Sequence, residues 1–276
     1  MTAAMRSIAH ISDLHFGRHD AGIADALIHQ INDTHPDLVV VSGDLTQRAR
    51  MNEFVQARHF LDRISPPVLI VPGNHDIPLY NLVHRFFSPL WKFHRHIPSG
   101  IGGNDWYSDH ELAVLGLNTA RGVTFKSGRV SMDQMGLIRR SFAHIPEIAW
   151  RIVVTHHPIA SAHGEARIEL AGRSMLALRA IANAGVHLLL SGHHHRPVSG
   201  HASTELLLNN AILVVHAGTA VSTRTRDEEV NSYNLIRLDG AHASIDTMKW
   251  SAGSGFQMFD RAKYQLRAGH MEPEAG

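Results

Sequence analysis

Five short polar motifs, each placed directly after an apolar run, constrain the fold of this chain more than any other feature. The motifs read DLH, GD, GNHD, HHP and GHHH, and begin at Asp13, Gly43, Gly73, His156 and Gly192. The apolar runs before them are typical of buried strands. If these strands lie in one sheet, their carboxyl ends place carboxylate, imidazole and amide groups at one edge, where open α/β folds bind ligands. The pattern therefore predicts an α/β protein with a polar site at a sheet edge.

The rest of the chain alternates between strand and helix patterns. Strands are expected at 6–12, 38–42, 67–71, 111–118, 150–155, 211–217, 232–238 and 242–249, and helices at 20–34, 51–64, 131–143 and 173–184. The first three strands are separated by two helices, which favours a largely parallel arrangement. The last strands follow one another across tight turns, which favours a second, more antiparallel sheet.

Composition limits the organisation of the chain. With 276 residues and 44% apolar residues, one large domain or two small ones are possible, and no repeat or linker divides the sequence. We therefore expect a single domain over 1–266, followed by a small, polar and disordered tail at 267–276.

Charge and residue usage exclude several classes of protein. No apolar run reaches 18 residues, so no membrane span is expected. Cysteine is absent, which rules out disulfides and thiolate metal sites and favours a cytoplasmic location. The formal net charge of +1 provides no basic surface for nucleic acid.

The order of the five motifs, DxH, GD, GNHD, HxP and GHxH, resembles that of the calcineurin-like metallophosphoesterases. Within that superfamily the chain is most similar to bacterial class III cyclic-nucleotide (cAMP) phosphodiesterases and related small-diester enzymes. The resemblance implies a four-layer α/β/β/α sandwich in which two mixed β-sheets pack face to face with helices outside.

The resemblance also implies a site for two divalent metal ions. Asp44 would be the bridging ligand, one site would be completed by Asp13, His15 and His195, and the other by Asn74, His156 and His193. Two cations about 3.5–4 Å apart can act together on a phosphate ester. Mixed nitrogen and oxygen ligands suit manganese, iron, zinc or cobalt better than magnesium or calcium.

Some of these residues have other interpretations when taken alone. An aspartate after a strand often caps a helix or forms a turn. In an extended segment His193 and His195 point the same way and His194 points oppositely, so His194 is expected to face substrate or support the ligands. His156 matches the family position before Pro158, and the role of His157 stays open.

Two residues of the GNHD motif are candidates for catalysis by resemblance. His75 would lie over the leaving oxygen and donate a proton or hydrogen bond, and Asp76 would orient its ring. The attacking group would be a hydroxide that bridges the two metals.

Residues 78–103, between two ligand motifs, are rich in aromatic and basic side chains. One interpretation is a cap that offers apolar surface and positive charge to the leaving group, with Tyr80 as a candidate substrate contact. The other is an outer helix that buries its aromatic residues. In a later loop, Arg224 or Arg226 could reach the metal edge, although its balanced charges are typical of a solvated loop.

These features predict a dinuclear phosphodiesterase for a small phosphodiester, with cAMP as the leading substrate and a homodimer allowed. Diesters are favoured over monoesters because no arginine or lysine lies within the five motifs. The alternatives are a pyrophosphate or nucleotide-lipid hydrolase of the UDP-2,3-diacylglucosamine type and an inactive binding protein on the same scaffold. A DNA nuclease is disfavoured by the neutral charge.

Overall fold

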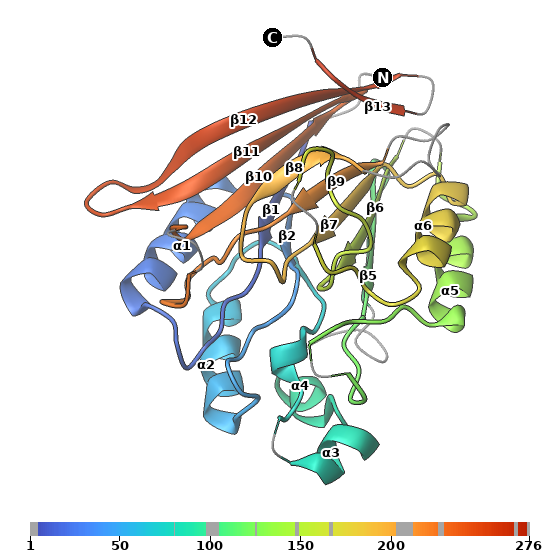
Figure 1. Ribbon diagram of the computed structural model, residues 1–276. Helices are drawn as coiled ribbons and strands as arrows, with labels where there is room; N and C mark the ends of the chain where they lie inside the picture. The colour runs from blue at the N-terminus through green and yellow to red at the C-terminus, as the bar shows by residue number, and fades with distance from the viewer. Residues whose placement is uncertain are drawn as a thin grey trace.

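Two mixed β-sheets form the centre of the protein (Figure 1). The computed structural model describes residues 5–79, 81–97, 105–124, 126–146, 149–165, 168–202, 212–225, 229–267 and 270–274. The first sheet has the order β13-β12-β11-β10-β1-β2-β3, and the second has the order β4-β5-β6-β7-β9-β8.

The strands of the first sheet are β1 (Arg6–Ile11), β2 (Leu38–Val41), β3 (Val68–Ile70), β10 (Ser232–Asp239), β11 (His242–Ser251), β12 (Gly255–Arg267) and β13 (His270–Pro273). Those of the second are β4 (Asp105–Ser108), β5 (Leu112–Leu117), β6 (Trp150–Thr155), β7 (Leu188–Ser191), β8 (Val198–His201) and β9 (Leu213–His216). The helices are α1 (Ala21–Thr34), α2 (Met51–Asp62), α3 (Leu82–Phe87), α4 (Trp91–His96), α5 (Met132–Phe142) and α6 (Ser174–Asn183), with a 3-10 turn, η1, at Asn74–Asp76.

Alternating side chains along the strands explain the layers. In β2, Val39 and Val41 pack with α1 and α2, whereas Leu38 and Val40 pack between the two sheets. This division follows from the two-residue period of a strand, because successive side chains leave opposite faces. Strands that are apolar on both faces are therefore covered on both sides.

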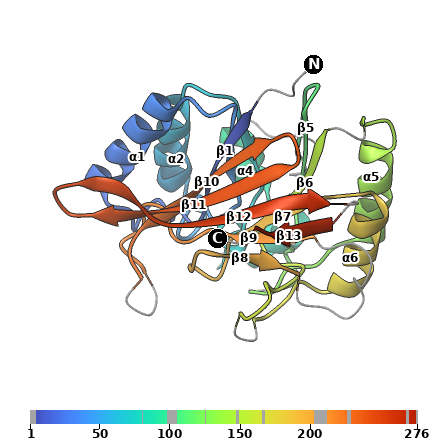
Figure 2. The same cartoon turned by 90° about the horizontal axis from the view of Figure 1, so that it is seen from above.

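Helices cover the outer face of each sheet. Figure 2 shows α1 and α2 on the side of the first sheet and α5 and α6 on the side of the second. Apolar residues of α5 and α6 form a separate cluster with the outer face of the second sheet. The predicted α/β class with two mixed sheets between helices is confirmed.

Parallel pairing brings the motif-bearing strand ends to one edge. β1, β2 and β3 are parallel neighbours in the first sheet, as are β5, β6, β7 and β9 in the second. The loops after β1 and β2 are joined by Asp13 N–H to the Gly43 carbonyl and by His15 N–H to the Asp44 carbonyl. Across the sheets, the His193 N–H donates to Asp13 Oδ2 at 3.0 Å. The motifs thus meet where the edges of both sheets adjoin.

The C-terminal segment differs from the expectation of a disordered tail. β12, which the sequence pattern did not indicate, is followed by β13, which pairs antiparallel with it from Tyr264↔Pro273 to Arg267↔His270. Met271 is fully buried in the core between the sheets. One apolar anchor and a main-chain ladder are enough to hold this short, otherwise polar edge strand.

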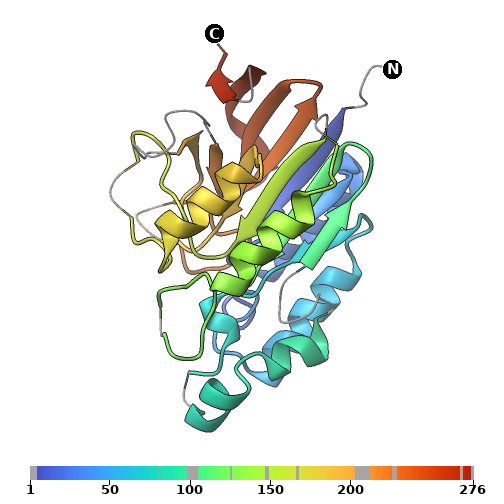
Figure 3. The ribbon, with the colours of Figure 1, turned by 90° about the vertical axis from the view of Figure 1, so that its right-hand side faces the viewer.

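The segment between two ligand motifs forms α3 and α4, at the end of the molecule opposite the two chain termini (Figure 3). Its basic residues serve partly as braces, since Arg85 donates to the carbonyls of Pro78 and Thr124 and Lys92 Nζ donates to the Ala49 carbonyl. Phe93 is buried, whereas Phe86 and Phe87 are 53% and 86% exposed. The segment therefore combines a buried anchor with an apolar outer surface.

Candidate metal centre

The side chains predicted to bind the first cation lie close together in the structure. Oδ1 of Asp13 lies 3.3 Å from His195 Nε2 and 3.6 Å from His15 Nε2. Oδ2 of Asp44 is 3.8 Å from the same His15 nitrogen. These four side chains come from the loops after β1, β2 and β7, and all are buried. They form one compact set of nitrogen and oxygen donors.

The second predicted set adjoins the first through Asp44. His156 Nε2 lies 3.3 Å from Asp44 Oδ2, 3.2 Å from Asn74 Oδ1 and 3.3 Å from His193 Nδ1. Asp44 Oδ2 therefore faces both sets, while its Oδ1 accepts the backbone N–H of His75 at 2.8 Å. The arrangement has one carboxylate oxygen at its centre, as a shared ligand requires.

Several polar atoms of the first donor set lack a hydrogen-bond partner among the described residues, as expected for atoms that bind a cation. Asp13 Oδ1 and both ring nitrogens of His15 are buried without a hydrogen-bond partner among the described residues. Such unpaired buried polar atoms cost free energy unless another group satisfies them. An oxygen and imidazole donor set of this kind suits a transition-metal ion.

The ionisation of the centre also fits a cation. Burial opposes ionisation of Asp44, but neighbouring His156 and His75 outweigh it and hold the pKa of Asp44 well below its ordinary value. Burial alone would lower the pKa of His156, but the Asp44 carboxylate raises it to about 9. A proton on His156 would balance this carboxylate. Binding a metal at this nitrogen would release that proton.

The backbone conformation turns these residues inward. Asp13, His15, Asp44, His193 and His195 all have φ between 47° and 75°, in the left-handed region. Non-glycine residues rarely adopt this conformation, and strain of this kind is concentrated at functional sites. The sharp turns allow residues at the ends of straight strands to point back toward one another.

Two motif glycines allow the loops to approach this closely. A Cβ atom at Gly73 would overlap the Asp44 carboxylate, and one at Gly192 would overlap Ser12 Oγ. Ser12 Oγ donates to Asp13 Oδ2 at 2.7 Å, so this contact supports a predicted ligand. The glycines of GNHD and GHHH are therefore required by the space beside the ligands.

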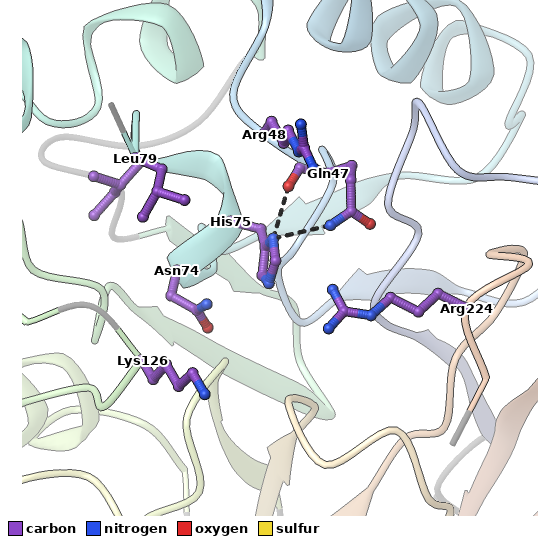
Figure 4. A pocket seen from close by; sticks show the side chains of 8 residues that line it. Gln47, Arg48, Asn74, His75, Leu79, Lys126 and Arg224 are labelled. Carbon is purple, nitrogen blue, oxygen red and sulfur yellow. Dashed lines mark hydrogen bonds between the residues drawn. The ribbon is translucent and has the colours of Figure 1, made fainter. Parts of the chain in front are cut away.

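The surroundings of His75 correct one expectation. We expected Asp76 to orient the His75 ring, but His75 Nδ1 donates to the Gln47 carbonyl at 2.7 Å (Figure 4). The Asp76 carboxylate instead accepts the N–H groups of Gly73, Leu45 and Thr46 and the Thr46 hydroxyl. Burial and the nearby Asp44 carboxylate raise the pKa of Asp76 to about 6, although these donors favour its ionised form. Asp76 braces the loop that carries His75, and a backbone carbonyl orients the ring.

His157 and His194, which are neighbours of predicted ligands in the chain, form hydrogen bonds to groups outside the two donor sets. His157 Nδ1 lies 2.8 Å from Thr119 Oγ1, and its Nε2 donates to the Lys126 carbonyl at 2.9 Å, so both nitrogens are engaged. His194 Nε2 donates to the Glu169 carbonyl at 3.4 Å. Tyr80, a predicted substrate contact, lies outside the described residues.

A cavity of about 390 Å³ opens beside the centre and is lined by Asn74 and His75 together with Arg48, Lys126 and Arg224 (Figure 4). No lysine or arginine lies within the five motifs, and these three come from loops outside them. Arg224 was expected to be able to reach the metal edge, whereas Arg226 lies outside the described residues. Arg48 and Lys126 follow strands whose carboxyl ends lie at the same edge, which is the signal that could have identified them. No comparable signal marks Gln47, because its backbone carbonyl makes the contact.

Comparisons with known proteins agree with this geometry. Over 81 residues, or 25% of this chain and 29% of the relative, the chain is 41% identical to a glycerophosphodiester phosphodiesterase GpdQ of Enterobacter lignolyticus. It is 25% identical to the 3′,5′-cyclic adenosine monophosphate phosphodiesterase CpdA of Haemophilus influenzae over 165 residues, 59% of this chain and 56% of the relative. The matched region thus spans 29% of the first relative's length and 56% of the second's.

A solved structure shows the same fold. A dimetal phosphatase from Danio rerio superposes with a TM-score of 0.64 at 15% identity, covering 94% of this chain and 98% of that one. The model of the calcineurin-like phosphoesterase family matches residues 6–197, a span that contains all five motifs. The chain therefore belongs to the calcineurin-like phosphoesterase family.

Proposed function

We propose that the protein is a dinuclear metal-dependent phosphodiesterase that hydrolyses a small phosphodiester, with cyclic AMP as the leading substrate. The observation that carries the proposal is the pair of donor sets that share Asp44 Oδ2 beside the cavity lined by His75. The names of the two phosphodiesterase relatives support the reaction class.

Seven residues would hold the two cations. Asp13, His15 and His195 would complete one site, Asn74, His156 and His193 the other, and Asp44 would belong to both. Manganese, iron, zinc and cobalt suit these donors. When bound, two such cations supply Lewis acidity toward the phosphate ester and toward water.

The residues around the cations have separate tasks. Thr219 Oγ1, 2.7 Å from His195 Nδ1, and the Ser42 carbonyl, 2.8 Å from His156 Nδ1, orient two imidazoles so that Nε2 faces the centre. His75 Nδ1–H donates to the Gln47 carbonyl, and the ring lines the cavity. From there the ring could donate a proton or a hydrogen bond to the departing oxygen as the phosphorus–oxygen bond breaks.

A substrate panel tests the proposal. We expect manganese-reconstituted protein to hydrolyse bis-nitrophenyl phosphate with a higher kcat/KM than nitrophenyl phosphate, because the diester carries only one negative charge. Cyclic AMP is the natural diester to include. A ratio below one would contradict the diesterase assignment.

Hydrolysis of a nucleotide-linked lipid is the second candidate. The exposed Phe86 and Phe87 on α3 favour it, because large exposed apolar side chains commonly mark a binding surface. α3 follows Leu79, which lines the cavity. Activity on UDP-2,3-diacylglucosamine alone within the panel would select this candidate over the first.

Location, assembly and domain organisation remain predictions. No helix in the described part of the chain is both long and apolar enough to cross a bilayer. The lack of cysteine underlies our proposal of a cytoplasmic location. Fractionation of cells tests this, sedimentation analysis tests the homodimer, and limited proteolysis tests the single domain over 1–266.

A further inference from the structure

Two adjoining cavities beside His75 share a set of positively charged side chains. The first, of about 390 Å³, is lined by Arg48, Lys126 and Arg224. The second, of about 560 Å³, is lined by Arg18 and again by Arg48 and Arg224. Among the residues that the structure describes, neither lining includes a carboxylate. Four cations from four loops therefore face one hollow region.

This concentration of charge is local. The whole chain has 26 lysines and arginines against 25 acidic residues. Other arginines are paired with carboxylates, such as Arg6 with Asp37 and Arg261 with Asp246. Within the described ranges, by contrast, no carboxylate lies within ion-pair distance of the four cavity cations. A cleft lined by one sign of charge attracts ligands of the opposite sign.

The loops that carry these cations are attached to the candidate active site. His157 Nε2 donates to the Lys126 carbonyl at 2.9 Å. The Ser222 and Thr223 hydroxyls donate to the Arg18 carbonyl, which ties the Arg224 loop to the loop after β1. Hydrogen bonds thus attach the backbone at Lys126 and at Arg18 to neighbouring loops.

The direction of the side chains locates the expected ligand charge. Figure 4 shows Arg224 and Lys126 extending from opposite sides toward the space in front of Asn74 and His75. His75 would face the departing alcohol, so this space would receive the departing group. The two cations of the metal centre would meet the single charge of a diester. Arg224 and Lys126, which have no carboxylate partner among the described residues, would then face a second anionic group.

We propose that the departing group of the substrate carries an anionic group of its own, a carboxylate or a second phosphate, which Arg224 and Lys126 bind. This inference rests on the proposed diester hydrolysis and narrows its substrate class to diesters with a second anionic group. It therefore argues against cyclic AMP, which carries a single anionic group. Water adds to phosphorus, the bond to the departing oxygen breaks, and that oxygen takes a proton, so the released product is an alcohol bearing an anion. Arg48 and Arg18 extend the same charge into the second cavity.

A matched pair of substrates tests the inference. Methyl 4-carboxyphenyl phosphate and methyl 4-carbamoylphenyl phosphate have departing groups of similar shape, of which only the first is charged. We expect the wild-type enzyme to prefer the charged substrate by about tenfold in kcat/KM, as for one charge-assisted contact. Methyl 4-(phosphonomethyl)phenyl phosphate distinguishes a preference for phosphate-like anions from one for carboxylates.

Variants assign the preference to the two side chains. In the double variant Arg224→Gln, Lys126→Gln, the ratio of the two kcat/KM values should fall toward one. Arg139→Gln, which changes an exposed arginine on α5, should keep the wild-type ratio. Equal kcat/KM values in the wild type, or a preference that survives in the double variant, would overturn the inference.

A binding measurement separates this inference from the proposed reaction. In the presence of a chelator, so that no metal can hold a carboxylate, 4-hydroxybenzoate should bind the wild-type protein more tightly than 4-hydroxybenzamide in ligand-observed NMR. The double variant should bind both equally. Absence of turnover with this binding preference intact would refute the diesterase and retain the anion site, whereas equal binding would refute the anion site itself.

Discussion

At the scale of single residues, the site depends on which atom of each side chain is free. Asp44 uses Oδ1 to accept the His75 N–H, which leaves Oδ2 facing His15 and His156. His156 uses Nδ1 on the Ser42 carbonyl, so its Nε2 faces Asp44 Oδ2 and Asn74 Oδ1 at the centre. Side chains oriented by other hydrogen bonds lose less entropy when they bind a ligand. Each prediction for these residues therefore concerns one atom with a defined direction.

The first prediction concerns His75. His75→Ala should lower turnover by about 10²–10⁴-fold for a diester with a poor leaving group, because a proton donor is lost. Nitrophenyl diesters should suffer less, since nitrophenolate departs without a proton. Steady-state kinetics on both substrate types measures the difference, with exposed His29→Ala as the control. Equal losses on the two substrates, or loss of metal, would assign His75 a structural or ligand role.

The second prediction concerns metal stoichiometry. Asn74 Oδ1 contacts His156 of the second donor set, whereas Asp44 Oδ2 faces both donor sets. Asn74→Ala should therefore reduce the bound metal from two ions per chain toward one, and Asp44→Asn should weaken both sites. Elemental analysis of desalted, reconstituted protein gives the count, and Asn183→Ala at the end of α6 is the matched control. A count of one ion in the wild type contradicts the dinuclear proposal.

At the scale of elements, one buried carboxylate adds side-chain links to the backbone pairing of β10, β11 and β12. Asp246 on β11 is 2% exposed and accepts hydrogen bonds from Arg261 on β12 at 2.6 and 2.8 Å. Arg237 on β10 donates to the same carboxylate. Burial opposes ionisation, but these arginines outweigh it and hold the pKa of Asp246 below its ordinary value. One side chain thereby links three strands.

The third prediction follows from this link. Asp246→Asn should reduce the free energy of unfolding at pH 7 by about 1.5–3 kcal/mol, the range for hydrogen bonds to charged groups. Because the folded pKa is depressed, the stabilisation is present above the unfolded pKa and is lost as pH falls through the folded pKa. The difference between wild type and variant should therefore shrink below about pH 4.

Urea unfolding of the two proteins between pH 3 and pH 7 measures this difference. Asp239→Asn, which changes an exposed carboxylate at the end of β10, should alter stability by less than about 0.5 kcal/mol. A difference between wild type and Asp246→Asn that does not change with pH would show that the effect is steric.

At the scale of the whole molecule, the centre joins the two sheets. Asp13 and Asp44 come from loops of the first sheet, and His156, His193 and His195 come from loops of the second. The direct polar link of His193 N–H to Asp13 Oδ2 crosses the same boundary. A ligand held by both groups would therefore stabilise the packing of one sheet on the other.

The fourth prediction is a metal-dependent melting temperature. A ligand at about 100 times its dissociation constant stabilises a protein by about 2.7 kcal/mol, which corresponds to roughly 5–10 °C for a chain of this size. We expect calorimetry to show this rise when Mn²⁺ replaces a chelator, and a smaller rise in Asp44→Asn. An identical melting temperature with Mn²⁺ and with chelator would argue against a metal that bridges the sheets.

Much of the fold and the donor set could be predicted from the sequence, because both depend on local pattern. Apolar runs such as Leu38–Val41 mark strands buried on both faces, and a polar motif after each run marks a strand end. The chemical types of Asp44, His156 and their neighbours then indicate a metal site. Apolar patterning and donor chemistry are properties of the side chains themselves, so they can be identified from the sequence alone.

Only the tertiary structure decided the contacts made through space. The Gln47 carbonyl that orients His75 is chemically the same as that of any other residue, so no sequence pattern could mark it. Lys126 and Arg224 are far apart in the chain and share a cavity because their loops leave the same sheet edge. Met271 of β13 packs in the core between the two sheets, a contact that depends on how the sheets are placed. Local chemistry thus determined which groups are available, and packing determined which of them meet.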